Sequence, residues 1–326
     1  MEAINNNENS INYYNFNEDC SFITLGTKTG FKIVNLNPPY KYFERKFGLG
    51  IGIIEMYKKS NILALTGCEK NSKFPENALI IWDENKGEII KEMRIIHKIR
   101  IIKIINNFLF LVNDIKLYIF NFPSLNLFYS IEIYSFQKEL ISFNINKDIK
   151  IAFLKNENTI NLMQINKHKK EKNNEKKIII IKDEKKEFIY LKFNTKGDIL
   201  SVIMNNSILL YNTLNGDLIK EIYNDNLKDK NINCIQFSEN DKYMAISTTG
   251  NNARINIFDI EEYKQKSIFD FFWGNEIQCF AYYKLNSEDF IFAFNENNDI
   301  IIIQSNGEFY KIILDKINGG YCKKFT

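Results

Sequence analysis

Short apolar runs recur along the whole chain, each of five to seven residues rich in Ile, Phe, Val and Tyr, with turn residues between them. Few stretches keep a 3.6-residue apolar period over ten or more residues, so the pattern predicts β-strands and not helices. Because the strands are short, numerous and regularly spaced, the chain is predicted to be all-β.

A pattern at strand ends repeats seven times and sets the architecture. Each copy reads apolar–aromatic–polar or a close variant: Ile33-Val34-Asn35, Ile81-Trp82-Asp83, Ile119-Phe120-Asn121, Leu162-Met163-Gln164, Leu210-Tyr211-Asn212, Ile257-Phe258-Asp259 and Ile303-Gln304-Ser305. Their middle residues lie 38 to 48 positions apart, which brackets the ~40–45 residues of a four-stranded WD-repeat blade. A single seven-bladed WD-repeat-type β-propeller is therefore predicted for residues 11–326, after a disordered Asn-rich start at residues 1–10.

One segment departs from the repeat. Residues 167–177 (KHKKEKNNEKK) are charged and low in complexity. Such a run is typical of a solvated insertion between strands of the fourth blade, and a basic patch for a membrane or a partner is the alternative.

Composition excludes several classes of protein. Hydrophobic residues make up 45% of the 326, enough for a large core, and a net charge of +3 is low for a nucleic-acid binder. The longest unbroken apolar runs, such as Phe108 to Val112, have five residues, whereas a membrane-spanning helix needs about 20. Five widely spaced cysteines suggest no disulfide framework, and Cys20 and Cys234 are predicted to be small core residues. A soluble protein of a reducing cytosol is expected.

Motifs for catalysis, metals and cofactors are missing. Only His97 and His168 exist, 71 residues apart, and no His, Cys or carboxylate cluster has the spacing of metal ligands. The chain has no nucleophile elbow, phosphate loop or dinucleotide fingerprint. Gly48 to Gly52 is Gly-rich but precedes no helix, so a flexible link between the first two blades is expected. No enzyme activity, cofactor or metal is predicted.

Several runs resemble the PROPPINs, β-propellers that bind phosphatidylinositol 3-phosphate and 3,5-bisphosphate in autophagy. Asn17 to Pro38 (NEDCSFITLGTKTGFKIVNLNP) resembles the first blade of that family, and GIGIIEM and ILALTG follow as they do there. Asn71 to Asp83 (NSKFPENALIIWD) is similar to the KFPPNKVxIWD signature of its WIPI-like subgroup, and Asn298 to Leu314 resembles its seventh blade. The resemblance implies a cytoplasmic, monomeric adaptor, peripheral on autophagic or endosomal/vacuolar membranes, that recruits a protein partner such as a lipid-transfer protein.

The lipid-binding motif of the family is degenerate here. PROPPINs carry Phe/Leu-Arg-Arg-Gly between blades five and six, with one arginine for each of two head-group pockets. The corresponding stretch of this chain reads Ile222-Tyr223-Asn224-Asp225 and has no arginine. Tyr and Asn cannot reproduce the planar, two-pronged hydrogen bonding of arginine to phosphate. The resemblance therefore leaves at most one, weakened pocket.

Blade six keeps more of the family pattern. The head-group residues that the resemblance implies are Ser247, Thr248, Thr249 and Arg254, with the charges of Lys228 and Lys230 nearby. The histidine that the family has in the strand of Arg254 is replaced by Asn256. The alternative is an ordinary solvated edge of the blade, with Arg254 paired to an acidic neighbour.

Two other surfaces follow from the resemblance. In residues 261–274, the counterpart of a family loop that enters the bilayer, the apolar residues are Ile268, Phe269, Phe271, Phe272 and Trp273. Aromatic residues suit the bilayer interface, but their alternation also fits a buried outer strand. At the edge between blades two and three, the implied partner contacts are Phe74, Pro75 and Asn77, which the alternative assigns to a turn. The leading hypothesis is a lipid-binding adaptor, and the second is a protein–protein scaffold that has lost lipid binding.

Overall fold

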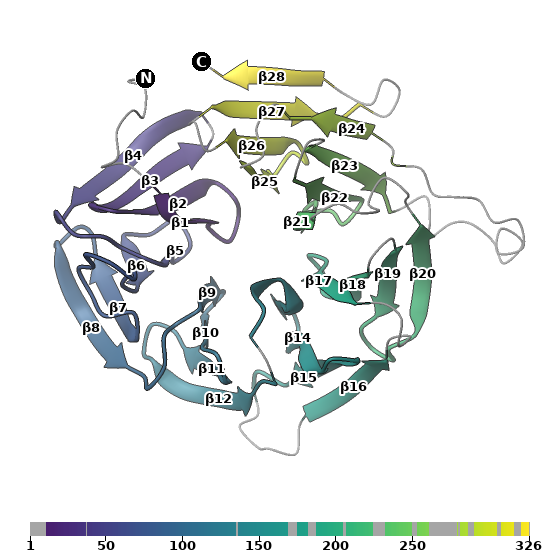
Figure 1. Ribbon diagram of the computed structural model, residues 1–326, viewed down its shortest axis with the longest axis horizontal. Helices are drawn as coiled ribbons and strands as arrows, with labels where there is room; N and C mark the ends of the chain where they lie inside the picture. Colours follow the sequence, from purple (N-terminus) through teal and green to yellow (C-terminus); the bar gives the residue numbers. More distant parts are fainter. Residues whose placement is uncertain are drawn as a thin grey trace, which may run out of the picture. The chain divides into compact units, whose positions relative to one another are not determined.

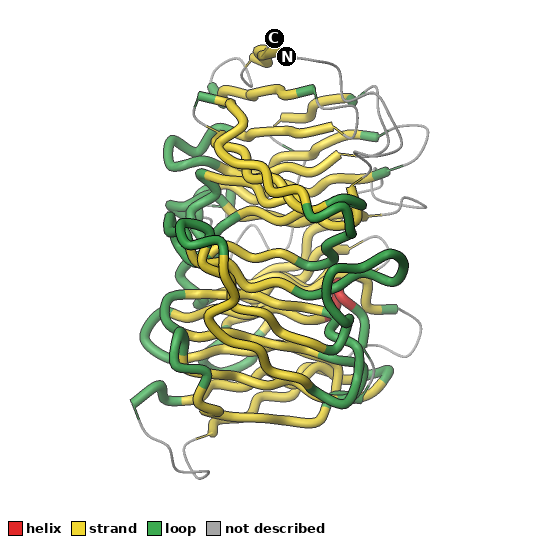
Figure 2. The backbone as a smooth tube through the Cα atoms, turned by 90° about the vertical axis from the view of Figure 1, so that its left-hand side faces the viewer, coloured by secondary structure: helices red, strands yellow, loops and turns green. Residues whose placement is uncertain are grey.

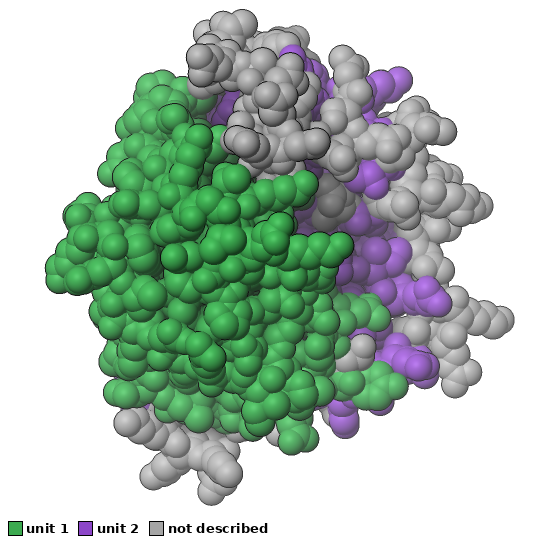
Figure 3. Space-filling view, turned by 60° about the vertical axis from the view of Figure 1, so that its left-hand side comes forward, with its two compact units in different colours: residues 1–138 green, residues 139–326 purple. Residues whose placement is uncertain are grey.

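The computed structural model describes residues 11–326 except 37, 135, 169–174, 182–186, 205–206, 224–231, 250–252, 261–278, 280, 286–289, 305–307, 316–320 and 326. These residues form seven four-stranded antiparallel sheets, and Figure 2 shows that strands dominate the backbone. The chain divides into two compact units, residues 1–138 and 139–326 (Figure 3). Residues 1–10, expected to be disordered, lie outside the described part.

Unit 1 holds the first three sheets, each built from four consecutive strands (Figure 1). They are β1 (Ile11–Phe16), β2 (Phe22–Thr27), β3 (Gly30–Leu36) and β4 (Pro39–Lys46); β5 (Ile54–Met56), β6 (Ile62–Leu65), β7 (Ala78–Asp83) and β8 (Glu88–Arg94); and β9 (Ile101–Ile105), β10 (Phe108–Val112), β11 (Lys116–Asn121) and β12 (Asn126–Glu132).

Unit 2 holds the other four sheets, in the same up-and-down order. A 3-10 turn, η2 (Lys138–Leu140), precedes them. They are β13 (Ile141–Ile145), β14 (Ile149–Asn156), β15 (Thr159–Ile165) and β16 (Glu175–Ile181); β17 (Phe188–Phe193), β18 (Ile199–Met204), β19 (Ser207–Asn212) and β20 (Leu218–Tyr223); β21 (Ile232–Phe237), β22 (Tyr243–Thr248), β23 (Arg254–Asp259) and β24 (Ala281–Lys284); and β25 (Phe290–Phe294), β26 (Ile300–Gln304), β27 (Phe309–Ile313) and β28 (Tyr321–Phe325).

These sheets are the blades of a seven-bladed β-propeller, numbered one to seven along the chain, which confirms the predicted fold class. Inner strands are apolar on both faces, as expected where blades pack on one another, and all six residues of β7 are buried. Among the outer strands whose burial is described, β8 is the most exposed, with six of its seven residues at the surface. Within each unit, apolar clusters join consecutive blades: one and two, two and three, four and five, five and six, and six and seven.

The strand-end triplets locate the third strand of six blades, from β3 to β23. The seventh triplet is different, because Ile303 and Gln304 end β26, the second strand of its sheet. Residues Ala281–Lys284, which precede it, pair with β23 as the outer strand of blade six. In the charged segment 167–177, β16 begins at Glu175, so the last three residues belong to a strand.

In the Gly-rich stretch Gly48 to Gly52, Gly50 and Gly52 form a close-packed junction where a flexible link was expected, whereas Gly48 is exposed with open space around it. A Cβ atom on Gly52 would lie 2.1 Å from the carbonyl oxygen of Gly67, and one on Gly26 would lie 2.2 Å from that of Gly52. Ile51 is fully buried between these glycines. Glycine is needed here so that three backbone segments of blades one and two can approach one another.

Candidate functional site

Blade six carries a polar face near one end of its central strands. In the antiparallel register, Thr248 lies opposite Arg254, which lies opposite Lys284 on the outer strand. Two residues further along β23 than Arg254, Asn256 lies between Ile246 on β22 and Tyr282 on β24. Residues that face each other across strands, and those two positions along, share one side of a sheet. We call Thr248, Arg254, Asn256, Tyr282 and Lys284 the blade-six polar face.

This face contains buried polar atoms without partners. Thr248 and Asn256 are fully buried, yet Oγ1 of Thr248 and both amide atoms of Asn256 have no hydrogen-bond partner in the described structure. Leaving such atoms unsatisfied costs about 1–3 kcal/mol each. Native proteins rarely accept that cost, so these atoms point to a site for water or a ligand.

The arginine of the face is half-buried and lies against an aromatic ring. Its Cζ atom is 5.8 Å from the ring centroid of Tyr282, within the range of a cation–π interaction. Burial raises the pKa of the Cys279 thiol, and the positive charge of Arg254 opposes that effect. Lys284 is exposed beside it. The face therefore combines two cations with buried groups that can donate and accept hydrogen bonds.

The structure brings only some of the predicted head-group residues together. Ser247 lies on the other side of β22 from Thr248, and its hydroxyl is 3.4 Å from the carbonyl oxygen of Cys234. Thr249 follows the end of β22. Lys228 and Lys230 lie outside the described residues, as do Ile268, Phe269, Phe271, Phe272 and Trp273 of the expected membrane loop.

The degenerate motif begins as ordinary strand. Ile222 is fully buried in the cluster between blades five and six, and Tyr223 ends β20 opposite Ser207. Asn224 and Asp225 fall outside the described part of the chain. The first motif position is therefore occupied by a core residue.

At the edge between blades two and three, the expected partner residues shape the loop. Phe74 is 8% exposed and packs in the core of blades one and two, so it is not available as a surface contact, contrary to expectation. The amide of Asn77 donates to the carbonyl oxygen of Ile95 at 2.8 Å. Pro75 is exposed, and its carbonyl oxygen accepts from the backbone N–H of Ala78 at 3.1 Å.

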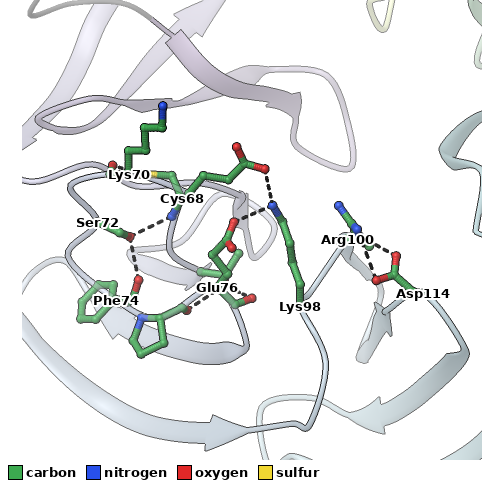
Figure 4. Close-up of polar contacts among 11 residues, drawn as sticks. Cys68, Lys70, Ser72, Phe74, Glu76, Lys98, Arg100 and Asp114 are labelled. Carbon is green, nitrogen blue, oxygen red and sulfur yellow. Dashed lines mark hydrogen bonds and ion pairs between the residues drawn. The ribbon is translucent and has the colours of Figure 1, made fainter.

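A charged group that sequence reasoning missed covers this edge (Figure 4). Lys98 Nζ lies 2.8 Å from Glu69 Oε1 and 2.6 Å from Glu76 Oε1. Arg100 forms a two-pronged pair with Asp114 at 2.7 and 3.2 Å. We call these five residues the edge cluster. The hydrogen bond from Lys98 lowers the pKa of Glu69.

An exposed apolar side chain lies close to the edge cluster in sequence. Ile96, between β8 and β9, is 91% exposed, two residues before Lys98. Because it is exposed and near charged residues in sequence, Ile96 is a candidate contact for a protein partner.

The described residues contain neither a candidate metal site nor a candidate membrane-spanning helix. No group of three or more His, Cys, Asp or Glu residues there could hold a metal ion. No helix in the same part of the chain is long and apolar enough to cross a membrane.

Comparison with curated proteins gives partial matches. No protein-family profile matches the chain. SVP1-like protein 2 of Schizosaccharomyces pombe is 32% identical over 114 residues, 35% of this chain and 31% of that protein. Autophagy-related protein 18 of Candida glabrata is 32% identical over 139 residues, 43% of this chain and 27% of that protein. The matches thus span under a third of the length of these relatives.

Solved structures match over the whole chain. Hsv2 of Kluyveromyces lactis superposes with a TM-score of 0.77 at 18% identity, over 98% of both chains. KlAtg21, solved with a coiled coil of AgAtg16, gives a TM-score of 0.76 at 14% identity, over 97% of this chain and 98% of that one. At these identities the matches are evidence of the common fold.

Proposed function

This chain is a PROPPIN-like seven-bladed β-propeller, and we propose that it is an autophagy-related adaptor that binds phosphoinositide membranes and recruits a protein partner. The membrane lipid would be phosphatidylinositol 3-phosphate or the 3,5-bisphosphate, bound at the blade-six polar face. The protein would act as a monomer, in the cytoplasm and on autophagic or endosomal/vacuolar membranes. It is a binding protein and not an enzyme, as its resemblance to non-enzymatic PROPPIN propellers indicates.

The blade-six polar face carries the lipid part of this proposal. Arg254 and Lys284 supply positive charge next to Thr248, whose buried hydroxyl has no partner among the described residues. A guanidinium group and a hydroxyl group can both donate hydrogen bonds to phosphate oxygens. Hydrogen bonds to charged groups contribute about 1.5–3 kcal/mol each. With one pocket in place of two, binding to a single head group is expected to be weak. Membrane recruitment would then depend on several contacts made together.

The partner part of the proposal rests on the edge between blades two and three. KlAtg21 has the same fold and was solved with a coiled coil of AgAtg16. We assign the partner surface of this chain to the exposed residues Ile96 and Pro75 and to the edge cluster. A helical partner with apolar and charged positions suits such a surface, and a lipid-transfer protein remains the partner that the family resemblance implies.

A scaffold without lipid binding is the second candidate function. The observation in its favour is the motif between blades five and six, where Ile222 is a core residue and neither arginine is present. In that case the protein would bind a protein partner at the edge between blades two and three and would bind no phosphoinositide.

Co-flotation with liposomes separates the two functions. Vesicles would contain phosphatidylinositol 3-phosphate, the 3,5-bisphosphate or unphosphorylated phosphatidylinositol, with wild type tested beside Arg254→Ala. Arg94→Ala is the matched control, because Arg94 is an exposed arginine paired with Glu92 in unit 1. The adaptor proposal expects selective flotation that Arg254→Ala loses and Arg94→Ala keeps. No flotation above the unphosphorylated control would leave the scaffold.

A further inference from the structure

The outer strand of blade four pairs more regularly than most other outer strands. In blades one, two, three and five the register shifts by one residue where the outer strand pairs, so that strand carries a β-bulge. The residues that the shift leaves out of the pairing are all large and apolar or aromatic: Tyr42, Ile90, Phe128 and Ile219. The outer strands β24 and β28 pair without a shift, but over only four and five residues. By contrast, β16 pairs with β15 over seven consecutive residues, Glu175 to Ile181, without a shift.

A regular outer strand leaves an open sheet edge. β16 is last in the order β13-β14-β15-β16 and lies at the outside of its blade (Figure 1), so its outward N–H and C=O groups have no further strand of that sheet to pair with. Proteins commonly blunt such edges with bulges or by keeping the strand short, as the other outer strands here do. An edge that stays regular over seven residues is the form to which an extended peptide can add as a further strand.

The residue types of β16 suit strand addition. Ile178 to Ile181 are four consecutive isoleucines, and β-branched residues favour strands. Because successive residues of a strand alternate between faces, positions 178 and 180 fall on one face of the sheet and positions 179 and 181 on the other. An added strand would therefore lie beside isoleucine positions on both faces of the blade.

The charge of this part of the chain indicates which strand would be accepted. Lys176 and Lys177 belong to β16. Lys167, in the connection from β15, is exposed and donates to the carbonyl oxygen of Asn146 at 2.8 Å. In the sequence of residues 167–187, lysines outnumber acidic residues nine to five. Like charges disfavour pairing of β16 with a second copy of itself, whereas an acidic strand is attracted.

We infer that β16 is a docking edge for an extended, acidic segment of a partner protein, which adds to blade four as a fifth strand. Main-chain hydrogen bonds would supply the affinity, and Lys176 and Lys177 would supply the preference for acidic residues. The inference gives the charged segment 167–177 a role that the proposed function leaves open. It depends neither on the blade-six polar face nor on the edge cluster.

Three short synthetic peptides of equal length test the inference on the full chain by fluorescence polarisation. The first alternates valine with glutamate, and the second alternates valine with lysine. The third is the glutamate peptide N-methylated at two neighbouring central residues, so that both of its edges lose a hydrogen-bond donor while its charge stays the same. The glutamate peptide should bind about tenfold or more tightly than either of the others.

Charge reversal on β16 separates docking from a purely structural role. Lys176→Glu with Lys177→Glu should exchange the preference, so that the lysine peptide binds more tightly than the glutamate peptide. Lys41→Glu with Lys46→Glu is the matched control, because it makes the same charge change on β4, an outer strand that carries a bulge. This control should keep the wild-type preference. Thermal unfolding of each variant confirms that it is folded.

Three results would overturn the inference. The first is no saturable binding of the glutamate peptide to wild type up to about 1 mM. The second is equal binding of the N-methylated peptide, which would mean attraction by charge without strand addition. The third is flotation with phosphatidylserine vesicles that the β16 charge reversal abolishes, in the absence of peptide binding, which would make this segment a membrane-binding patch instead.

Discussion

A buried ion pair ties together the inner strands of unit 1 and gives the sharpest test of how these blades are held. Glu55 on β5 is fully buried. Its Oε1 lies 2.9 Å from Lys103 Nζ and accepts from the backbone N–H of Ile104 at 3.2 Å, while its Oε2 accepts from the amide of Asn15. The lysine also donates to the carbonyl oxygen of Phe16 at 3.1 Å. One carboxylate thus joins β1, β5 and β9.

Glu55→Ala is expected to destabilise the protein by about 3–5 kcal/mol, because it leaves the Lys103 ammonium without its counter-charge and two N–H donors without their acceptor. The double variant Glu55→Leu with Lys103→Met should recover the part of that loss that comes from the unpaired charge, since an apolar pair of similar volume replaces the ion pair, while the N–H donors of Ile104 and Asn15 still lack their acceptor. Urea unfolding followed by tryptophan fluorescence measures both. A loss below about 1 kcal/mol for Glu55→Ala, or a double variant no better than the single one, would refute the reasoning.

Three further predictions concern stability. Asp241→Ala should lower the free energy of unfolding by about 2–4 kcal/mol, measured by thermal unfolding. The reason is that this carboxylate joins blade six to the turn of blade five by accepting from the backbone N–H groups of Thr195 and Lys196 at 2.7 and 2.9 Å. A loss under about 1 kcal/mol would contradict this role. Burial alone would raise the pKa of Asp19, but hydrogen bonds from Lys59 and Ser21 outweigh it and lower the pKa. The ionised group therefore stabilises the fold above pH ~4, and this contribution is lost as the pH falls through the lowered pKa. Asp19→Asn should flatten the dependence of the free energy of unfolding on pH in urea titrations between about pH 6 and 3, and an unchanged dependence would be inconsistent with the ion pair. Phe74→Ala should cost about 3–5 kcal/mol in the same titration, as a core residue does, whereas a surface contact would cost little.

The fold could be predicted from sequence because each blade repeats the same central-strand pattern. A third strand packed on both faces must be apolar and must end at a polar turn, and six triplets located it correctly. The seventh triplet also ends a strand, β26, but this strand is the second of its sheet. The outer strand of blade six, Ala281–Lys284, pairs with β23 across a long stretch of sequence, which leaves no local signal. The resemblance to PROPPINs is confirmed by similarity to Autophagy-related protein 18 and the Hsv2 propeller.

The candidate sites were less predictable. Strand alternation could have shown that the neighbours Ser247 and Thr248 face opposite sides of β22, and that signal was available in the sequence. By contrast, Tyr282 and Lys284 join the polar face through a register that the sequence does not encode locally. The cysteine expected in the core at position 20 instead occupies a turn with φ of 55°, because the polar residues Asn17 to Asp19 and Ser21 around it form the connection between β1 and β2.

Methyl NMR of the blade-six polar face tests the central claim most directly. The full chain, labelled at isoleucine and threonine methyl groups, would be titrated with inositol 1,3-bisphosphate. We expect the signals of Thr248 and Ile246, which lie on the face that carries Arg254 and Asn256, to shift in a saturable way, while the exposed Ile96 of unit 1 stays unchanged. Shifts confined to other blades, or none at millimolar ligand, would contradict a head-group site on blade six.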